Sequence, residues 1–95
     1  MRKFDWDHAK ERANIRSRGI SFLEARSLFL DEDRLEMPDQ RHSDVELRMI
    51  TIGWSNRARL LVVVTSERDL ESPRIISARR ATKRERDVYS RRRRP

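Results

Sequence analysis

Apolar positions at helical spacing predict two short helices in the first third of the chain. Asp7 is a good N-cap for a helix over about His8 to Arg18, and Gly19 is placed to end it in a left-handed conformation. The segment from Ser21 to Glu24 forms a capping box and opens a second helix, which we expect to run to about Leu30. The first third is therefore expected to form a helical hairpin.

The middle of the chain changes to patterns that are typical of β-strands. Leu35 and Met37 alternate with polar residues in a short edge strand that Pro38 ends. The stretch from Val45 to Trp54 predicts a strand whose apolar residues change parity halfway. Either its first part is the polar end of an unbroken strand, or a β-bulge intervenes. Residues Leu60 to Val64 are apolar on both faces, as in a central strand.

The last third predicts one more strand and one more helix. The strand covers Arg74 to Ala78, and a second capping box from Thr82 to Glu85 opens the helix. A further small strand is expected near the start, from Arg2 to Asp5. Strands joined by short turns are antiparallel, so the order predicts a small single α+β domain. We expect about four antiparallel strands packed against helices over residues 1–90, and a basic, frayed tail over residues 91–95.

Composition limits the class of protein further. With 95 residues, of which 36% are hydrophobic and 41% charged, the chain can form one small core under a strongly ionic surface. No apolar run approaches the ~18 residues that a membrane span needs, and no secretory signal is expected. The absence of cysteine excludes disulfides and thiolate chemistry. This fits a reducing cytoplasm and no membrane partner.

The net charge of +7 is concentrated at the C-terminal end. Residues 1–77 contain 14 Lys and Arg against 14 Asp and Glu, whereas residues 78–95 contain nine against two. Such a block predicts a polyanionic partner, and arginine forks match phosphates especially well. Nucleic acid is therefore the favoured partner, and a solvated basic tail is the alternative.

Several kinds of chemistry find no support in the sequence. The two glycines are isolated, which excludes a glycine-rich phosphate loop, and no nucleophile-elbow motif is present. His8 and His42 are far apart and lack suitably spaced carboxylates, so neither a metal site nor a cofactor is expected. RNA can still be cleaved without a metal, because its own 2′-hydroxyl can attack the neighbouring phosphorus. The protein would then transfer protons and neutralise charge on the phosphate.

Six side chains are candidates for that chemistry on residue type and position alone. His42 titrates near neutrality, although it can equally be an ordinary loop histidine. Glu46 and Arg48 would project from one face of a strand, as a catalytic carboxylate with a phosphate-binding cation or as a solvated ion pair.

The other three candidates come from the last third of the chain. Arg79 and Arg80 point to opposite faces of an extended strand, so at most one of them joins a given site. Tyr89 can supply a phenol or a stacking platform, or it can belong to the core.

Segments spread over nearly the whole chain, from Phe4 to Tyr89, together resemble the BrnT toxin family. They are Phe4–Asp7 with Lys10 and Asn14, Gly19–Phe22 with Glu24 and Ala25, Asp39–Ser43, Glu46–Arg48, Ile52–Gly53, Arg59–Val64, Glu67–Arg68, Arg74–Arg79, and Ala81–Thr82 with Glu85, Arg86 and Tyr89. No single segment is diagnostic, but the ordered set is specific.

The resemblance carries expectations about fold, activity and partners. BrnT proteins are the toxins of bacterial type II toxin–antitoxin pairs. The resemblance implies a RelE-like fold and metal-independent endoribonuclease activity that cleaves RNA and inhibits translation, and it leaves open whether the RNA is cut free or on the ribosome. It also implies a BrnA-like antitoxin whose ribbon-helix-helix part binds operator DNA, in a complex of two toxins with two antitoxins.

The resemblance also bears on the site residues. Lys10, His42, Glu46, Arg48, Arg79 and Tyr89 match polar positions of the family pattern. We expect His42, Glu46, Arg79 and Tyr89 to be catalytic, and Lys10, Arg48 and Arg80 to bind RNA phosphates. In one departure from the pattern, Arg18 precedes Gly19 where the family commonly has histidine. The alternatives are a non-catalytic nucleic-acid-binding module and a degenerate toxin that binds its antitoxin without cleaving RNA.

Overall fold

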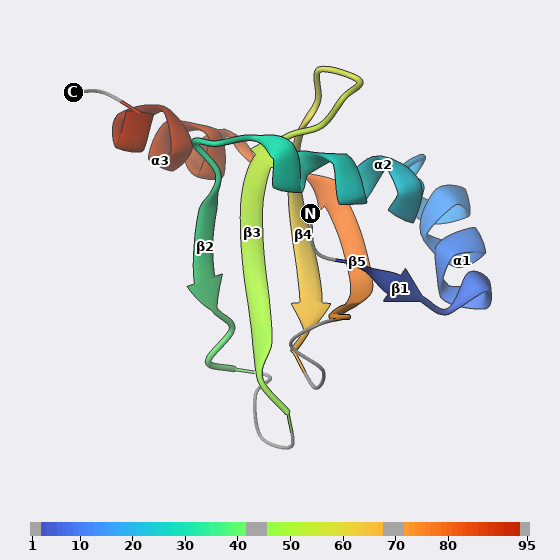
Figure 1. The fold of residues 1–95 in the computed structure, drawn as a ribbon. Helices are drawn as coiled ribbons and strands as arrows, with labels where there is room; N and C mark the ends of the chain where they lie inside the picture. Colours follow the sequence, from blue (N-terminus) through green and yellow to red (C-terminus); the bar gives the residue numbers. More distant parts are fainter. Residues whose placement is uncertain (1–2, 42–45, 68–71, 94–95) are drawn as a thin grey trace.

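The computed structural model describes residues 3–41, 46–67 and 72–93. These residues form one five-stranded sheet with helices on both of its faces (Figure 1). The elements are β1 (Asp5–Trp6), α1 (His8–Arg18), α2 (Phe22–Ser27), the 3₁₀ turn η1 (Leu28–Leu30), β2 (Leu35–Pro38), β3 (Arg48–Trp54), β4 (Leu60–Ser66), β5 (Arg74–Arg80) and α3 (Lys83–Arg93). The predicted α+β class is confirmed.

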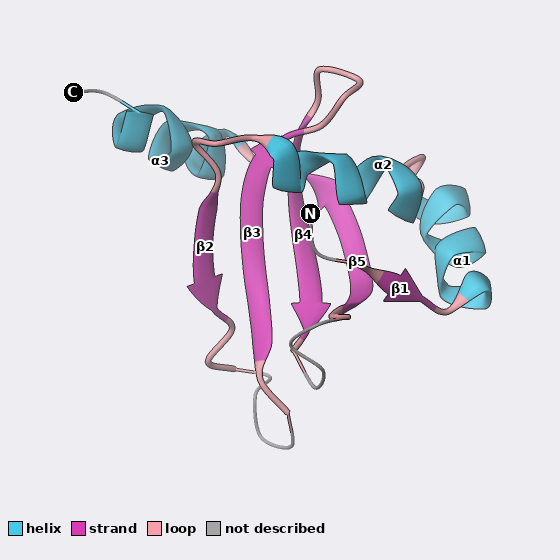
Figure 2. Cartoon of the chain, viewed as in Figure 1, coloured by secondary structure: helices cyan, strands magenta, loops and turns pink. Residues whose placement is uncertain are grey.

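The sheet has the strand order β1-β5-β4-β3-β2 (Figure 2). Strands β2 to β5 are antiparallel to their neighbours, as expected from the short connections. The fifth strand is the two-residue β1, which pairs in parallel with β5 through Asp5 opposite Arg74 and Trp6 opposite Ile75. The predicted count of about four strands was therefore one too low, because the small strand near the N-terminus joins the same sheet.

The predicted helix starts are confirmed by their capping bonds. The Asp7 carboxylate accepts hydrogen bonds from the backbone N–H groups of Ala9 and Lys10, at 2.7 and 3.3 Å. These bonds lower the pKa of Asp7. Gly19 ends α1 with φ of 70°. The second helix is shorter than expected, because its continuation tightens into the 3₁₀ turn η1 before Asp31.

Helices α1 and α2 cover the centre of one face of the sheet. Phe22, Ala25 and Leu28 pack there against Leu61 and Val63 of β4, and none of these side chains is exposed. Asn14 fastens α1 to the same face, since its amide donates to the Ala78 carbonyl at 2.9 Å and its carbonyl accepts from the Ala78 N–H at 3.2 Å.

A partly buried ion pair fixes α2 to the turn between β3 and β4. Glu24, which is 5% exposed, accepts hydrogen bonds from Arg59 and from the Ser55 hydroxyl, the latter at 2.7 Å. Burial alone would raise the pKa of Glu24, but these donors outweigh it and lower the pKa. Glu24 and Arg59, two residues of the family pattern, thus have a structural role.

Helix α3 covers only one end of the second face. Its Tyr89 is 2% exposed and packs with Leu35, Ile52, Leu60 and Val62. Further along β4, Val64 points to the same face as Val62 and is only partly buried. The expectation that β4 is covered on both sides therefore holds for its first half.

The last helix begins at the predicted capping box and extends to Arg93. The capping box is confirmed, because the Thr82 hydroxyl accepts from the Glu85 N–H at 3.2 Å and Glu85 accepts from the Thr82 N–H at 2.8 Å. The helix then continues through Arg93, beyond the position where a frayed tail was predicted to begin. No helix in the described part of the chain is long and apolar enough to cross a membrane.

The irregularity suspected in the third strand lies in β5 instead. Strand β3 begins at Arg48 and pairs with β4 without a break, so the bulge proposed there is absent from the described residues. In β5, Ser77 lies opposite Val64 but Ile75 lies opposite Thr65, which leaves Ile76 as an extra residue. Such a bulge exchanges the faces of the side chains on either side of it.

Candidate functional site

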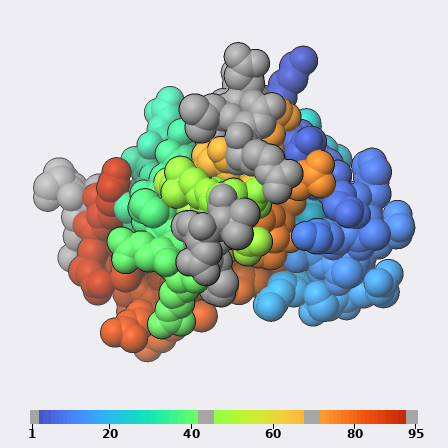
Figure 3. All heavy atoms as spheres, turned by 90° about the horizontal axis from the view of Figure 1, so that it is seen from below, coloured from blue at the N-terminus to red at the C-terminus, as the bar shows by residue number. Residues whose placement is uncertain are grey.

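The half of the second sheet face that α3 leaves uncovered carries or borders four of the seven predicted site residues, Lys10, Glu46, Arg48 and Arg79. We call this region the open face. Cross-strand partners share a face, so Arg79 lies on it beside Val62, Ser77 beside Val64, and Arg48 beside Ser66. Figure 3 shows this end of the molecule from below, with the strand ends between α1 in blue and α3 in red.

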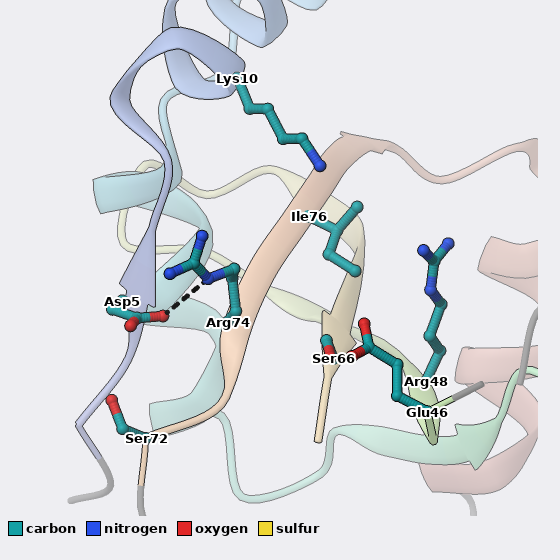
Figure 4. A pocket seen from close by; sticks show the side chains of 8 residues that line it. All are labelled: Asp5, Lys10, Glu46, Arg48, Ser66, Ser72, Arg74 and Ile76. Carbon is teal, nitrogen blue, oxygen red and sulfur yellow. Dashed lines mark ion pairs between the residues drawn. The ribbon is translucent and has the colours of Figure 1, made fainter. Parts of the chain in front are cut away.

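A hollow of about 360 Å³ lies at the far end of the open face. Its lining combines five charged side chains, two hydroxyls and one apolar side chain: Asp5, Lys10, Glu46, Arg48, Ser66, Ser72, Arg74 and Ile76. In Figure 4, Ile76 lies between the side chains of Lys10 and Arg48. The structure thus brings together three residues that the sequence singled out separately, Lys10, Glu46 and Arg48.

The positions of Glu46 and Arg48 differ in part from expectation. Arg48 is the first residue of β3 and is half-buried, whereas Glu46 lies two residues before the strand. The Glu46 side chain therefore reaches the hollow from a bend in the chain and not from a position within a regular strand. Both side chains still line the same hollow.

Arg79 is held in place by a bidentate ion pair with Glu85 of α3. Its Nη1 and Nη2 atoms each donate to one carboxylate oxygen of Glu85 at 2.7 Å, and Nη1 also donates to the Arg80 carbonyl at 3.3 Å. The hydrogen bonds that Glu85 accepts from Arg79, helped by those from Thr82, lower the pKa of Glu85 to about 2, and the same pair raises the pKa of Arg79.

The ion pair leaves one edge of the Arg79 guanidinium available. Within the described residues, no hydrogen bond uses its Nε–H, and the side chain is 37% exposed. This Nε and Nη2 edge is a planar fork of the kind that binds two phosphate oxygens. Arg79 also borders a shallow depression that extends over Asp39 and Arg41.

His42 directly follows Arg41 and lies outside the described residues. Of the catalytic candidates, only Arg79 and Glu46 therefore have described side chains on or beside the open face.

Arg80 and Tyr89 do not join this group. Arg80 lies opposite Leu61 and so points to the other face of the sheet, as the alternation had indicated. The Tyr89 hydroxyl donates to the Asp31 carboxylate at 2.6 Å from within the core. Asp31 also accepts from the Trp54 N–H at 2.9 Å, so Tyr89 ties α3 to the sheet.

Two residues of this region were missed at the level of sequence. Glu85 was recognised as part of a capping box and of the family pattern but not as a partner of Arg79, although its distance of six residues from Arg79 allows a strand-to-helix ion pair. Arg74 has the opposite parity to Arg79, which would place the two on different faces of a regular strand. The bulge at Ile76 puts both on the open face, and sequence alternation alone gives no signal for that.

Among the residues that the structure describes, no three His, Asp or Glu side chains gather in a way that could hold a metal ion. The open face and its border instead carry a cluster of four cationic side chains, Lys10, Arg48, Arg74 and Arg79. A surface of this kind is suited to binding phosphates.

Comparisons with known proteins define the class and then the family. The model of a ribonuclease toxin family matches residues 6–85, and its full description is "Ribonuclease toxin, BrnT, of type II toxin-antitoxin system". The chain therefore belongs to the BrnT toxin family, which confirms the resemblance seen in the sequence.

The fold agrees with that assignment. The crystal structure of the Brucella abortus ribonuclease toxin BrnT superimposes with a TM-score of 0.67 at 22% sequence identity, covering 87% of this chain and all of that one. No curated protein matches this sequence significantly. Membership of a type II toxin family gives the chain the role of a ribonuclease toxin and implies an antitoxin partner.

Proposed function

We propose that this toxin cleaves RNA without a metal ion, by promoting attack of a ribose 2′-hydroxyl on the adjacent phosphorus. The observation that carries the proposal is the state of Arg79 on the open face. One edge of its guanidinium is clamped by Glu85 and the other edge remains for a phosphate. A cation fixed in this way costs little reorganisation when charge develops on the phosphate.

The scissile phosphate is proposed to lie over β4 near Val64, between Arg79 and Arg48. Arg79 is opposite Val62 and Arg48 is opposite Ser66, so their backbones are about 13 Å apart along the strand direction. Both arginine side chains are long enough to reach toward the midpoint. Two guanidinium groups there would neutralise the two non-bridging oxygens of the phosphate.

The reaction needs one proton acceptor and one proton donor. As the 2′-oxygen bonds to phosphorus, a base takes its proton, and an acid protonates the 5′-oxygen as its bond to phosphorus breaks. The products would be a 2′,3′-cyclic phosphate and a 5′-hydroxyl. We assign these proton transfers to His42 and Glu46, which precede the first residue of β3 by six and two positions in the sequence, and leave open which is the base.

The remaining candidates take supporting roles in this proposal. Lys10 contributes a second phosphate contact from the hollow. Tyr89 holds α3 and thereby the helix that carries Glu85. Arg80, on the opposite face, stays outside the catalytic centre and adds only to the general positive field.

We propose a BrnA-like ribbon-helix-helix antitoxin as the partner, in a complex of two toxins with two antitoxins that acts in the cytoplasm. Family membership supports an antitoxin in general. The exposed basic side chains of α3 support an acidic or amphipathic antitoxin segment, since complementary charge speeds and orients association. Operator DNA would be bound only through that antitoxin.

The test is RNA cleavage by the purified toxin, freed of antitoxin, in excess EDTA. We expect fragments that end in a cyclic or 3′-phosphate. Arg79→Ala should reduce the rate by about a hundredfold or more, because it removes a charge-stabilising donor. His42→Ala is run beside it, and Arg57→Ala, an exposed change in the turn between β3 and β4, is the control that should keep full activity.

Two results would contradict the proposal. Full activity of a folded Arg79→Ala variant would remove Arg79 from the mechanism. Tight RNA binding by the wild type without fragments, repeated on translating ribosomes, would favour a binding module or a degenerate toxin.

A further inference from the structure

The bulge in β5 creates a second pair of arginines on the open face. Because Ile76 is an extra residue, Arg74 lies opposite Ser66 of β4, and Arg48 of β3 lies opposite the same serine from the other side. The two arginines therefore flank Ser66 in one row across three strands, about 10 Å apart at the backbone. Without the bulge, Arg74 would point to the opposite face, toward α1 and α2.

The hollow around this row has the chemistry of a nucleotide site. The Nε of Arg74 is 3.5 Å from the Asp5 carboxylate, the Arg74 side chain is 54% exposed, and no contact within the described residues occupies its terminal Nη atoms. The Lys10 side chain extends over β5 from the other side (Figure 4). Ser66 and Ser72 add hydroxyl groups, and Ile76 adds an apolar wall against which a ribose or base can rest.

The position of the hollow fits a neighbouring phosphate better than the scissile one. The row at Ser66 lies two residues, or about 7 Å, beyond the row at Val64, over which the scissile phosphate is proposed to lie. One nucleotide of an extended strand can cover that step. The lining of the hollow contains three cationic side chains and two carboxylates, and one of the carboxylates, Asp5, pairs with Arg74. This excess of positive charge favours binding of an anion.

We infer that the hollow binds the phosphodiester next to the scissile one in single-stranded RNA, and that Arg74 and Lys10 hold it. The inference rests on the proposed function for the position of the scissile phosphate. It adds Arg74 as a substrate-binding residue and assigns a function to the β5 bulge, which turns Arg74 onto the open face. The parallel pairing of β1 with β5 also contributes, because it places Asp5 where it orients Arg74.

The experiment measures binding of a 2′-O-methyl hexaribonucleotide, which cannot be cleaved because its 2′-oxygen is blocked. Fluorescence anisotropy over a range of salt concentrations gives both the affinity and the number of phosphate contacts. Arg74→Gln is expected to weaken binding by about tenfold and to lower the slope of log affinity against log salt by about 0.7. Arg74→Lys should keep the slope and lose part of the affinity, because it keeps the charge without the fork.

Arg57→Gln is the matched control, since it removes the same charge from the opposite end of β4. It should change the affinity less than twofold and leave the salt slope unchanged. Equal losses for Arg57→Gln and Arg74→Gln would overturn the inference, because only the overall field would then matter. Thermal unfolding of each variant checks that the fold is intact, and an Arg74→Gln variant that is folded but binds normally also overturns it.

A hexaglutamate peptide of similar charge distinguishes RNA from an acidic protein segment. If the peptide binds as tightly and with the same dependence on Arg74, the hollow is a site for acidic peptides and the RNA assignment is overturned. The cleavage test is separate from all of these measurements. If the wild type cleaves RNA but Arg74→Gln does not change binding, the proposed function stands and the inference about the hollow is overturned. If Arg74→Gln weakens binding as expected but the wild type does not cleave RNA, the hollow is supported as an RNA-binding site and the proposed cleavage is overturned.

Discussion

The two faces of the sheet are built for different tasks. The face under α1 and α2 is closed, and every apolar side chain of its central cluster, from Phe22 to Ala78, is fully buried. The other face is closed only where Tyr89 and α3 lie on it, and its remaining half carries Arg48, Arg74 and Arg79. The first face supplies the stability that allows the second to remain uncovered and charged.

Charged groups are also used differently on the two sides. On the closed side, Arg59 is bound to the buried Glu24 by two of its nitrogens and to the Gly19 carbonyl by another hydrogen bond. On the open side, Arg79 and Arg74 each have one carboxylate partner and keep one edge available. The partner of Arg59 is a carboxylate that is only 4% exposed, so this pair fixes the fold, whereas the carboxylate partners of Arg79 and Arg74 are 25% and 52% exposed and leave the cations within reach of a ligand.

The largest expected effect is a difference in the free energy of unfolding between two valine substitutions, one on each face of the sheet. Val63→Ala removes two carbons from the closed face and should lower the free energy of unfolding by about 2–3 kcal/mol. Val64→Ala, the same change on the open face, should cost about 1 kcal/mol or less. Urea denaturation followed by circular dichroism measures both. Equal costs would mean that the open face is packed as tightly as the closed one.

A smaller effect is expected where α3 is fixed to the second face. Tyr89→Phe removes the hydrogen bond to Asp31 and should cost about 1.5 kcal/mol, because hydrogen bonds to charged groups are worth more than neutral ones. RNA cleavage by the folded variant should stay within twofold of the wild type. A large loss of cleavage at unchanged stability would restore the catalytic role that the sequence predicted for Tyr89.

The smallest effect concerns the acid stability of the Arg79–Glu85 pair. The pKa of Glu85 is lowered from 4.5 to about 2 in the folded chain, so its contribution is fully present above pH 4.5 and is lost as the pH falls toward 2. Glu85→Gln should remove about 1 kcal/mol of stability at pH 6 and make the decline below pH 4.5 shallower. Urea midpoints from pH 6 to pH 3 give the comparison with wild type. Parallel pH curves for the two proteins would show that the pair does not stabilise the fold.

Much of the fold was predictable because its signals are local. Asp7, Ser21 and Thr82 occupy cap positions whose side chains bond to backbone atoms two or three residues away, and all three helices begin where predicted. The apolar run of β4 is also a local signal. It identified the central strand, because burial on both faces requires apolar residues at consecutive positions. The hollow was not predictable, because its lining comes from β1, α1, β3, β4, β5 and adjacent loops.

The sequence by itself determined the secondary structure, the central strand, the basic character and, through its ordered segments, the BrnT family. These properties depend on residues close to one another in the chain or on composition. Only the tertiary structure decided which charged side chains share a surface. One extra residue in β5 turned Arg74 onto the face of Arg79, and the docking of α3 placed Glu85 on Arg79. Both outcomes depend on pairing between distant segments, where a shift by one residue reverses the face of a side chain.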